Sequence, residues 1–273
     1  MSRVPLTLMA VHAHPDDEAS STGGILARYS AEGVRTVLVT CTNGELGDGR
    51  EATKPGEAGH DEAWVVAKRR RELEASCEIL GVSSLELLGY RDSGMMGWPQ
   101  NQAPGSFWTT PVAEAAGRLC GLIERYRPQV VVTYDANGFY GHPDHIQAHR
   151  ITLAALEQVQ TADKVYFPAI ANSDMGEFRE ALRAAGISDL AGDEEDWDLG
   201  VADELIAATV DCKGYTAKQY AALEAHESQA DMTFFLRLGV ELFSKLMRFE
   251  KFVRFYDRTG SPTVEDDLFA GLR

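Results

Sequence analysis

The sequence predicts an α/β fold built on a Rossmann-like, mostly parallel sheet with helices on both faces. Short apolar runs rich in β-branched residues, such as 6–11 (LTLMAV), 35–41 (RTVLVTC) and 129–134 (QVVVTY), alternate with longer segments of helical spacing. The runs are almost uniformly apolar, as strands covered on both faces must be. Strands that alternate with helices in this way are typical of a parallel sheet.

Glycine and proline residues indicate where the expected helices begin and end. The helix over 62–80 should end at Gly81, because glycine commonly caps a helix C-terminus. The helix over 111–127 starts with Pro111 and is followed by Pro128. In chain order, strands are expected at 6–11, 35–41, 84–89, 129–134 and 164–168, and helices at 18–32, 62–80, 111–127 and 145–158.

We expect a single domain over residues 1–273, with a Rossmann-like core at 1–168 and a C-terminal elaboration at 169–273. Residues 170–200 are acidic and broken by glycines, which predicts a helix followed by a lid-like surface loop. Further along, the expected elements are strands at 205–212 and 251–256, helices at 215–229 and 233–247, and a loose tail that docks through Leu268 and Phe269.

The composition and net charge exclude some classes of binding partner. The formal net charge is −16 and the only basic cluster is Lys68–Arg71, so nucleic-acid partners are not expected. No apolar stretch approaches the roughly 20 residues of a membrane span, and the N-terminus lacks a signal-peptide pattern. We therefore expect a cytoplasmic protein without a membrane partner, and we leave a homo-oligomer open. The four scattered cysteines form no CxxC pair, so a thiolate metal site is not expected.

Histidines and acids gather in two short stretches. HAHPDDE (12–18) follows the first expected strand, and HPDHIQAH (142–149) follows the strand at 129–134 after a short loop. The carboxyl ends of parallel strands meet at one edge of a sheet, so these stretches should converge. Imidazole and carboxylate groups suit zinc or a similar divalent ion, and a catalytic zinc keeps three protein ligands. Two histidines and one aspartate can be drawn from His14, Asp16, Asp17, His142 and His145.

The groups left over match the needs of hydrolysis: a carboxylate to take a proton from water, and an imidazole for the oxyanion or the leaving amine. Each stretch alone also has a plain structural reading, as a turn whose acids cap the next helix. We interpret His12 as a packed core residue, because it lies one pleat position from His14, on the same face as the core residue beside it. The glycine-rich loop with Glu45 and Asp48 is interpreted as solvated, although both could line the mouth of the site.

The motifs resemble those of the PIG-L / LmbE-like family of zinc-dependent N-deacetylases. AHPDDE after a first strand and GHPDH after VVVTYDANGFY look like the two family signatures. The resemblance extends through TNGELGD, an R-x-x-E pattern at Arg69 and Glu72, LGYRDSG at 88–94, YDANG at 134–138 and HESQ at 226–229. It therefore covers most of the chain. The resemblance implies that the HESQ segment approaches the pocket, but it assigns no role to His226.

The resemblance implies roles for individual residues. The zinc ligands would be His14, Asp17 and His145, with iron as an alternative metal. Asp16 would be the general base for the attacking water, and His142 would stabilise the oxyanion and protonate the leaving amine.

Four further residues match positions that support the reaction in the family. Asp144 would orient His142, and Tyr140 would reach the substrate carbonyl. Arg69 and Asp92 would hold sugar hydroxyls, although a salt bridge to a neighbour explains each equally well.

The resemblance implies a metal-dependent hydrolase that removes an N-acyl group, most simply N-acetyl, from an N-acetylglucosamine-type sugar or glycoconjugate, giving acetate and a free amine. Family members include a mycothiol-pathway deacetylase and a mycothiol S-conjugate amidase, and the amidase type of reaction is the alternative. The segments GFYGHPDH and RDSGMMGWPQN depart from both. A non-catalytic sugar-binding α/β module is a third possibility, but binding alone would not require a base and an acid beside a metal.

Overall fold

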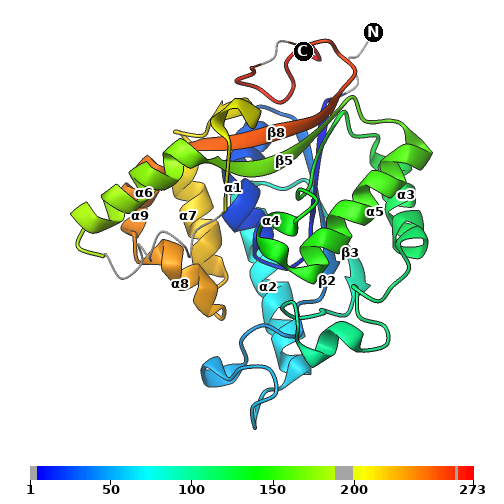
Figure 1. The fold of residues 1–273 in the computed structure, drawn as a ribbon, viewed down its shortest axis with the longest axis vertical. Coiled ribbons are helices and arrows are strands. Elements are labelled where there is room, and N and C mark those ends of the chain that lie inside the picture. The colour runs from blue at the N-terminus through cyan, green and yellow to red at the C-terminus, as the bar shows by residue number, and fades with distance from the viewer. Residues whose placement is uncertain (1–4, 188–198, 262–263) are drawn as a thin grey trace.

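The computed structural model describes residues 5–187, 199–261 and 264–273. Its centre is one eight-stranded sheet with the strand order β3-β2-β1-β4-β5-β8-β7, in which the short β6 pairs with β5 (Figure 1). β1 to β5 run parallel, and β8 is antiparallel to β5 and to β7. The strands are β1 (Thr7–His12), β2 (Arg35–Thr42), β3 (Ser84–Tyr90), β4 (Val130–Val132), β5 (Lys164–Ala171), β6 (Gly200–Val201), β7 (Ile206–Asp211) and β8 (Phe249–Asp257).

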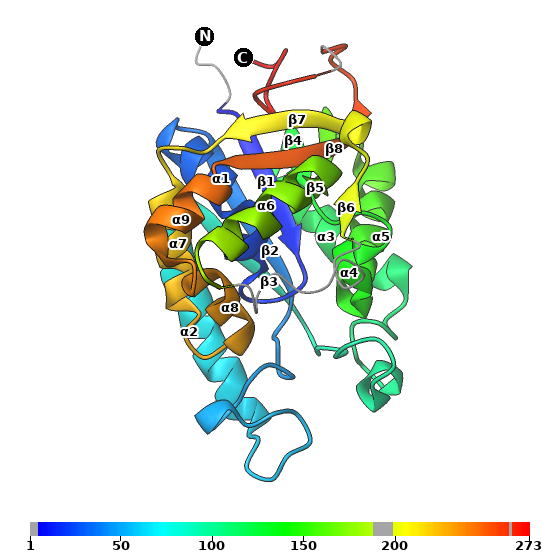
Figure 2. The same ribbon diagram turned by 60° about the vertical axis from the view of Figure 1, so that its left-hand side comes forward.

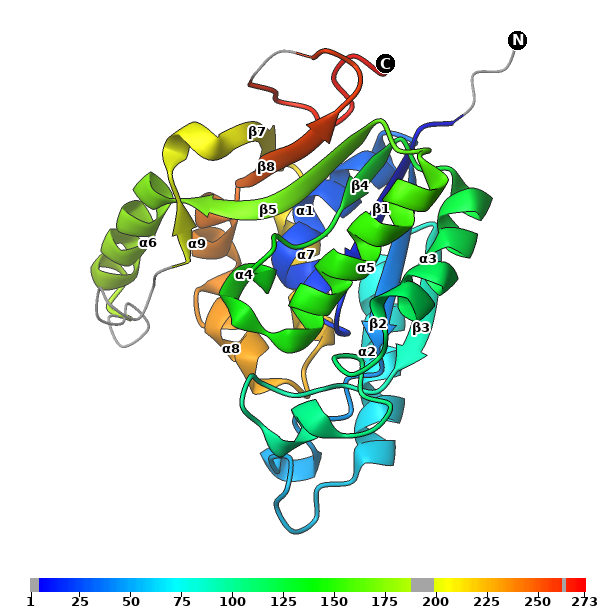
Figure 3. The same ribbon diagram turned by 45° about the vertical axis from the view of Figure 1, so that its right-hand side comes forward.

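Helices cover both faces of the sheet, which confirms the expected fold class. α1, α2 and α7 pack on one face and α3 and α5 on the other, as Figures 2 and 3 show from two sides. Because side chains alternate along a strand, Leu8 and Ala10 of β1 face the first layer, and Met9 and Val11 face the second. The helices are α1 (Asp17–Ala31), α2 (Glu62–Leu80), α3 (Val112–Tyr126), α4 (Gly138–Gly141), α5 (Pro143–Val159), α6 (Asn172–Ala184), α7 (Thr216–Ala225), α8 (Ala230–Leu236) and α9 (Gly239–Leu246). None of the helices in the described ranges is long and apolar enough to cross a membrane.

The strand order places a switch point between β1 and β4. From β1 the chain moves outward to β2 and β3, then returns to add β4 and β5 on the other side of β1. In sheets of this kind ligands bind outside the carboxyl ends of the strands at the switch point. The two histidine-rich stretches leave the sheet at these two strands, so the fold itself brings them together.

The C-terminal part departs from the expected elements in two places. The helix expected at 215–229 ends at Ala225, because the chain turns there and buries His226. The helix expected at 233–247 is two helices, α8 and α9, and Gly239 at the start of α9 has φ +66°, which a continuous helix does not contain. The tail is docked: Leu268 and Phe269 are fully buried in the core. The expected helix after residue 170 is α6, and most of the expected lid-like loop lies outside the described residues.

Gly24 of α1 gives a test of this packing. A Cβ there would lie 2.7 Å from Glu250 Oε1 and 2.8 Å from the Cys212 side chain, and the same Glu250 oxygen accepts the Gly24 N–H. We expect Gly24→Ala to lower the free energy of unfolding by about 1–3 kcal/mol, as overpacking does. Gly117→Ala in α3 is the matched control, because nothing lies near its added Cβ and the change should add about 0.5–1 kcal/mol. Urea unfolding curves measure both, and effects of equal sign would contradict this account.

Candidate metal centre and active site

The loop after β1 presents three charged groups at the sheet edge. His14 and Asp17 are joined by a hydrogen bond in which the His14 backbone N–H donates to Asp17 Oδ2 at 2.7 Å. The same oxygen lies 3.4 Å from His14 Nδ1. Asp16, between them, has φ +122°, a value that is rare for a residue other than glycine. Strain of this kind costs about 1–3 kcal/mol and persists only where neighbouring groups hold it.

The first turn of α5 brings His145 to the same point. His145 Nε2 lies 3.3 Å from His14 Nδ1 and 3.4 Å from Asp17 Oδ1. Donor atoms bound to one tetrahedral zinc at 2.0–2.1 Å are about 3.3–3.4 Å apart. The two nitrogens therefore have the spacing of ligands on one ion, and each also lies 3.4 Å from one of the two Asp17 oxygens. All three side chains are buried.

The outward nitrogen of each imidazole is already engaged. His14 Nε2 lies 3.2 Å from Asp144 Oδ2, and His145 Nδ1 lies 3.2 Å from the Gly138 carbonyl oxygen. Because both partners are acceptors, these nitrogens are placed to donate hydrogen bonds, which leaves His14 Nδ1 and His145 Nε2 as the nitrogens that could bind a metal. These two nitrogens face each other at 3.3 Å, where a divalent ion bound to both would replace the proton of their hydrogen bond.

Gly138 is needed for this arrangement. Its φ is +62°, and a Cβ at this position would lie 2.7 Å from His145 Cβ and from the Ile146 backbone nitrogen. A side chain would therefore push α5 and its histidine away from the sheet edge. The sequence motif YDANG ends at this glycine.

Carboxylates outnumber cations around His14. Burial lowers the pKa of His14, but Asp92, Asp144 and Asp17 together raise it well above its usual value. Burial raises the pKa of Asp17, but His145 and His14 outweigh that effect and hold it well below its usual value. An anionic pocket of this kind favours a divalent cation.

His142 lies beside these donors without sharing their contacts. Its Nδ1 accepts the Asp144 backbone N–H at 3.1 Å, so in the neutral ring the proton is on Nε2. Its ring centroid lies 4.5 Å from that of His14 and 5.0 Å from that of His145. Burial and the two neighbouring histidines lower the pKa of His142, which favours this neutral form. The ring is therefore placed to donate a hydrogen bond into the site.

Two other groups of residues also bring donor atoms together, and within each group all donor atoms lie within 4.8 Å of one another. One consists of His14, His142 and His145, and the other of His14, Asp92, His142 and Asp144. The second group is on the Nε2 side of His14. There Asp144 already accepts hydrogen bonds from the Ser93 hydroxyl (2.5 Å), the Ser93 backbone N–H (2.9 Å) and His14.

The contacts of Asp144 differ from those that the resemblance implies. Its carboxylate contacts His14 and Ser93, and only its backbone N–H contacts His142. In this structure the carboxylate holds His14, and the role of Asp144 in tuning or orienting His142 stays a prediction. Which imidazole a carboxylate faces depends on side-chain direction, which residue spacing does not encode.

Asp144→Ala should therefore weaken metal binding. An outer carboxylate that holds a metal-ligating histidine contributes about 10–100-fold in metal affinity, and we expect a loss of that size in a competition titration with a chromophoric chelator. Asp174→Ala, which removes a surface ion pair with Lys251, is the control and should keep full affinity. Unchanged affinity in Asp144→Ala, together with lost activity, would show instead that Asp144 acts on His142.

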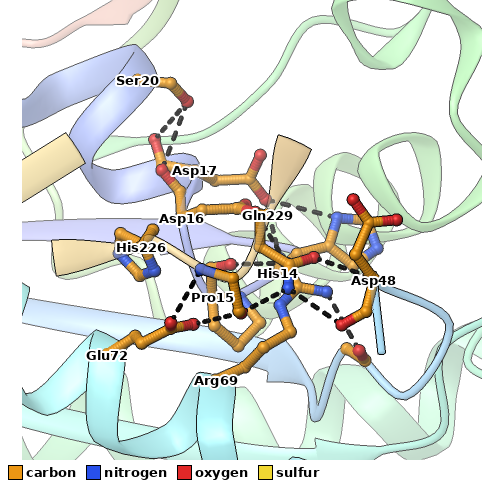
Figure 4. A network of polar contacts seen from close by, with 12 residues as sticks. His14, Pro15, Asp16, Asp17, Ser20, Asp48, Arg69, Glu72, His226 and Gln229 are labelled. Carbon is orange, nitrogen blue, oxygen red and sulfur yellow. Dashed lines mark hydrogen bonds and ion pairs between the residues drawn. The ribbon is translucent and has the colours of Figure 1, made fainter. Parts of the chain in front are cut away.

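Asp16 is held by Arg69, which reaches across from α2 (Figure 4). Arg69 Nη2 donates to Asp16 Oδ2 at 2.7 Å and to the Pro15 carbonyl at 2.6 Å, and Nη1 donates to the Gly44 carbonyl. Burial raises the pKa of Asp16 to about 6, with Arg69 opposing the rise and Asp17 adding to it. A carboxylate with a pKa near neutrality is suited to proton transfer.

The remaining expected residues lie around this centre. Asp92 is buried, its Oδ1 accepts the Gly94 N–H, and the same oxygen lies 3.8 Å from His14 Nε2. The Tyr140 ring is 45% exposed and its centroid lies 5.0 Å from that of His145. A direct contact with substrate stays a prediction for Arg69, Asp92 and Tyr140.

Sequence reasoning missed several supporting residues. Tyr134 stacks on His145, with ring centroids 4.1 Å apart, and Ser93 anchors Asp144. Both lie in family motifs, YDANG and LGYRDSG, but their partners are far away in the sequence. His12 is a packed residue as expected, since its ring contacts Tyr134 and Thr22.

The loop with Glu45 and Asp48 is buried, so the expectation of a solvated loop is wrong. Glu45 accepts the Asp92 backbone N–H, and Asp48 accepts the Ala230 backbone N–H. These partners come from distant segments, which cover the loop.

Comparisons with known proteins agree with this site. The family model described as GlcNAc-PI de-N-acetylase (PIG-L) matches residues 9–156, which include both histidine-rich stretches. The chain is 41% identical to a 1D-myo-inositol 2-acetamido-2-deoxy-alpha-D-glucopyranoside deacetylase of Acidothermus cellulolyticus, covering 97% of this chain and 95% of the relative. It is 43% identical to the enzyme of the same name from Salinispora arenicola, covering 97% and 91%.

A solved structure extends the comparison to the fold. The 4-carboxy-2-hydroxymuconate hydratase GalB from Pseudomonas putida matches with a TM-score of 0.60 at 20% identity, covering 94% of this chain and 99% of that one. At this identity the likeness concerns the fold alone, and a shared fold can serve a different reaction. The family match and the closely similar relatives place this chain in the PIG-L family of de-N-acetylases, hydrolases that act on an amide bond.

Proposed function

We propose that this enzyme removes the acetyl group of 1D-myo-inositol 2-acetamido-2-deoxy-α-D-glucopyranoside, giving acetate and the free amine. Support comes from curated relatives that carry this name and are 36–43% identical over nearly the whole chain. The inositol group of the substrate is proposed from the names of these relatives. The N-acetylglucosamine-type sugar follows from the family.

The observation that carries the proposal is that His14 Nδ1 and His145 Nε2 lie 3.3 Å apart and each lies 3.4 Å from one oxygen of the Asp17 carboxylate. We infer that these three residues hold the metal, with Zn²⁺ as the leading candidate and Fe²⁺ as an alternative. The Nδ1 side of His14 is favoured over the Nε2 side, because Nδ1 faces His145 Nε2 and Asp17, whereas Nε2 is hydrogen-bonded to Asp144.

The chain's own groups then have distinct tasks. A divalent ion at this site would polarise the amide carbonyl and lower the pKa of a water molecule. Asp16 takes the proton of the attacking water, and Arg69 holds the Asp16 carboxylate in place. His142 donates a hydrogen bond from Nε2 to the oxyanion, and the proton that Asp16 takes from the water is delivered to the leaving amine.

Three residues around the metal centre are proposed to recognise the sugar. Tyr140 is the most exposed of them and lies beside His145, so it can reach the acyl carbonyl. Asp92 can accept a sugar hydroxyl on the oxygen that does not bond Gly94. Arg69 has one Nη1 hydrogen beyond its bond to Gly44.

A fluorescamine assay for new primary amines tests the proposal. The zinc-loaded protein is incubated with N-acetylglucosamine, with its 1D-myo-inositol glycoside and with a mycothiol S-conjugate. We expect the inositol glycoside to give the highest kcat/KM, because the inositol adds binding contacts beyond the sugar. A preference for the S-conjugate would indicate an amidase, and binding of the glycoside by calorimetry without amine release would contradict hydrolysis.

A further inference from the structure

A fully buried polar cluster lies directly behind Asp16. Glu18 of α1 bonds His226 Nε2 through Oε1 at 2.7 Å, and the Ser76 hydroxyl of α2 donates to the same oxygen at 2.5 Å. Glu18, Ser76 and His226 are each 0% exposed. Three segments that are far apart in sequence therefore meet at one carboxylate.

The other oxygen of Glu18 contacts the expected base. The Asp16 backbone N–H donates to Glu18 Oε2 at 3.0 Å. This is the residue whose φ is +122°, so Glu18 holds a backbone conformation that would otherwise be unfavourable. Arg69 also holds this residue, because its guanidinium donates to the Asp16 carboxylate and to the carbonyl of the preceding Pro15, as Figure 4 shows. Asp16 is thus fixed on two sides.

A plain helix cap does not explain this cluster. A glutamate near the start of a helix often reaches back to the N-cap N–H, but it can do so from the surface. Burying the carboxylate requires partners, and here they come from α2 and from the turn after α7. Among the described residues, the ring of His226 hydrogen-bonds only Glu18, because its Nδ1 has no partner.

We propose that Glu18 is a positioning residue for the hydrolysis: clamped by His226 and Ser76, it fixes the Asp16 backbone so that the Asp16 carboxylate faces the attacking water. The HESQ segment thereby acts on the site through Glu18, without touching substrate. This inference rests on the proposed function, in which Asp16 is the base.

The test compares variants of the full-length, zinc-loaded protein with the inositol glycoside as substrate. For Glu18→Ala we expect kcat to fall about 30–100-fold while KM and zinc content change less than threefold. Glu18→Gln keeps an oxygen that can accept the Asp16 N–H, so its kcat should stay within about fivefold of the parent. Glu72→Ala is the matched control: Glu72 is also buried and bonds Ser228 in the same turn, but no hydrogen bond joins it to Asp16. Its kcat should change less than threefold.

A double variant separates positioning from general damage. On the Asp16→Asn background, Glu18→Ala should change the residual kcat less than twofold, because there is no base left to position. A further 30-fold loss on that background, or an equal loss in Glu72→Ala, would overturn the proposal. If Glu18→Ala does not fold, Ser76→Ala decides: a 3–10-fold fall in kcat at constant KM supports the proposal, and an unchanged kcat overturns it. Full activity of Asp16→Asn itself would instead refute the proposed function.

Discussion

Replacing Asp16 by Asn is expected to abolish most of the activity and leave the metal in place. The side-chain oxygen of the new amide can still accept a hydrogen bond from Arg69, so the local geometry should persist. An amide cannot take a proton from water, and the loss of a general base lowers kcat by about 10²–10⁴-fold. Zinc per chain, measured by elemental analysis, should stay at the parent value.

The control for this change is Asp61→Asn. Asp61 caps α2 by accepting the Trp64 N–H, and Asn caps helices as well as Asp does, so kcat should not change. Loss of zinc in Asp16→Asn would contradict the division of tasks between Asp16 and Asp17, because it would make Asp16 a ligand.

Replacing His14 by Ala should have an even larger effect, because both metal and activity are lost. His14 contributes one of three converging donor atoms, and its ring also bonds Asp144. With His14 gone, Asp17 and His145 alone cannot complete a three-ligand catalytic site. We expect less than one tenth of the parent zinc content after dialysis, and kcat below that of Asp16→Asn.

His149→Ala is the control for a histidine on the same helix as His145. Its Nδ1 contacts the Tyr134 carbonyl at 2.8 Å, outside the converging donors, so zinc content should stay at the parent value. If His14→Ala retained stoichiometric zinc, the proposed ligand set would be wrong.

The fold and the meeting of the two histidine-rich stretches could be predicted because both depend on backbone geometry. Alternating strands and helices imply a parallel sheet, and parallel strands place their carboxyl ends at one edge. His14 and His145 therefore meet although about 130 residues separate them.

Side-chain direction could not be predicted in the same way. The sequence places Asp144 next to His145 and near His142, yet its carboxylate faces His14 and Ser93 from other segments. Glu45 and Asp48 lie in a loop rich in glycine, and only their long-range partners bury them. Such contacts depend on which segments cover the site, and local patterns do not carry that information.

The most direct test of the account is a crystal structure of the zinc-loaded protein with anomalous data at the zinc edge. We predict one strong peak at about 2.0–2.2 Å from His14 Nδ1, His145 Nε2 and an Asp17 oxygen. A peak on the other side of His14, coordinated by Asp92 and Asp144, would contradict the proposed metal site.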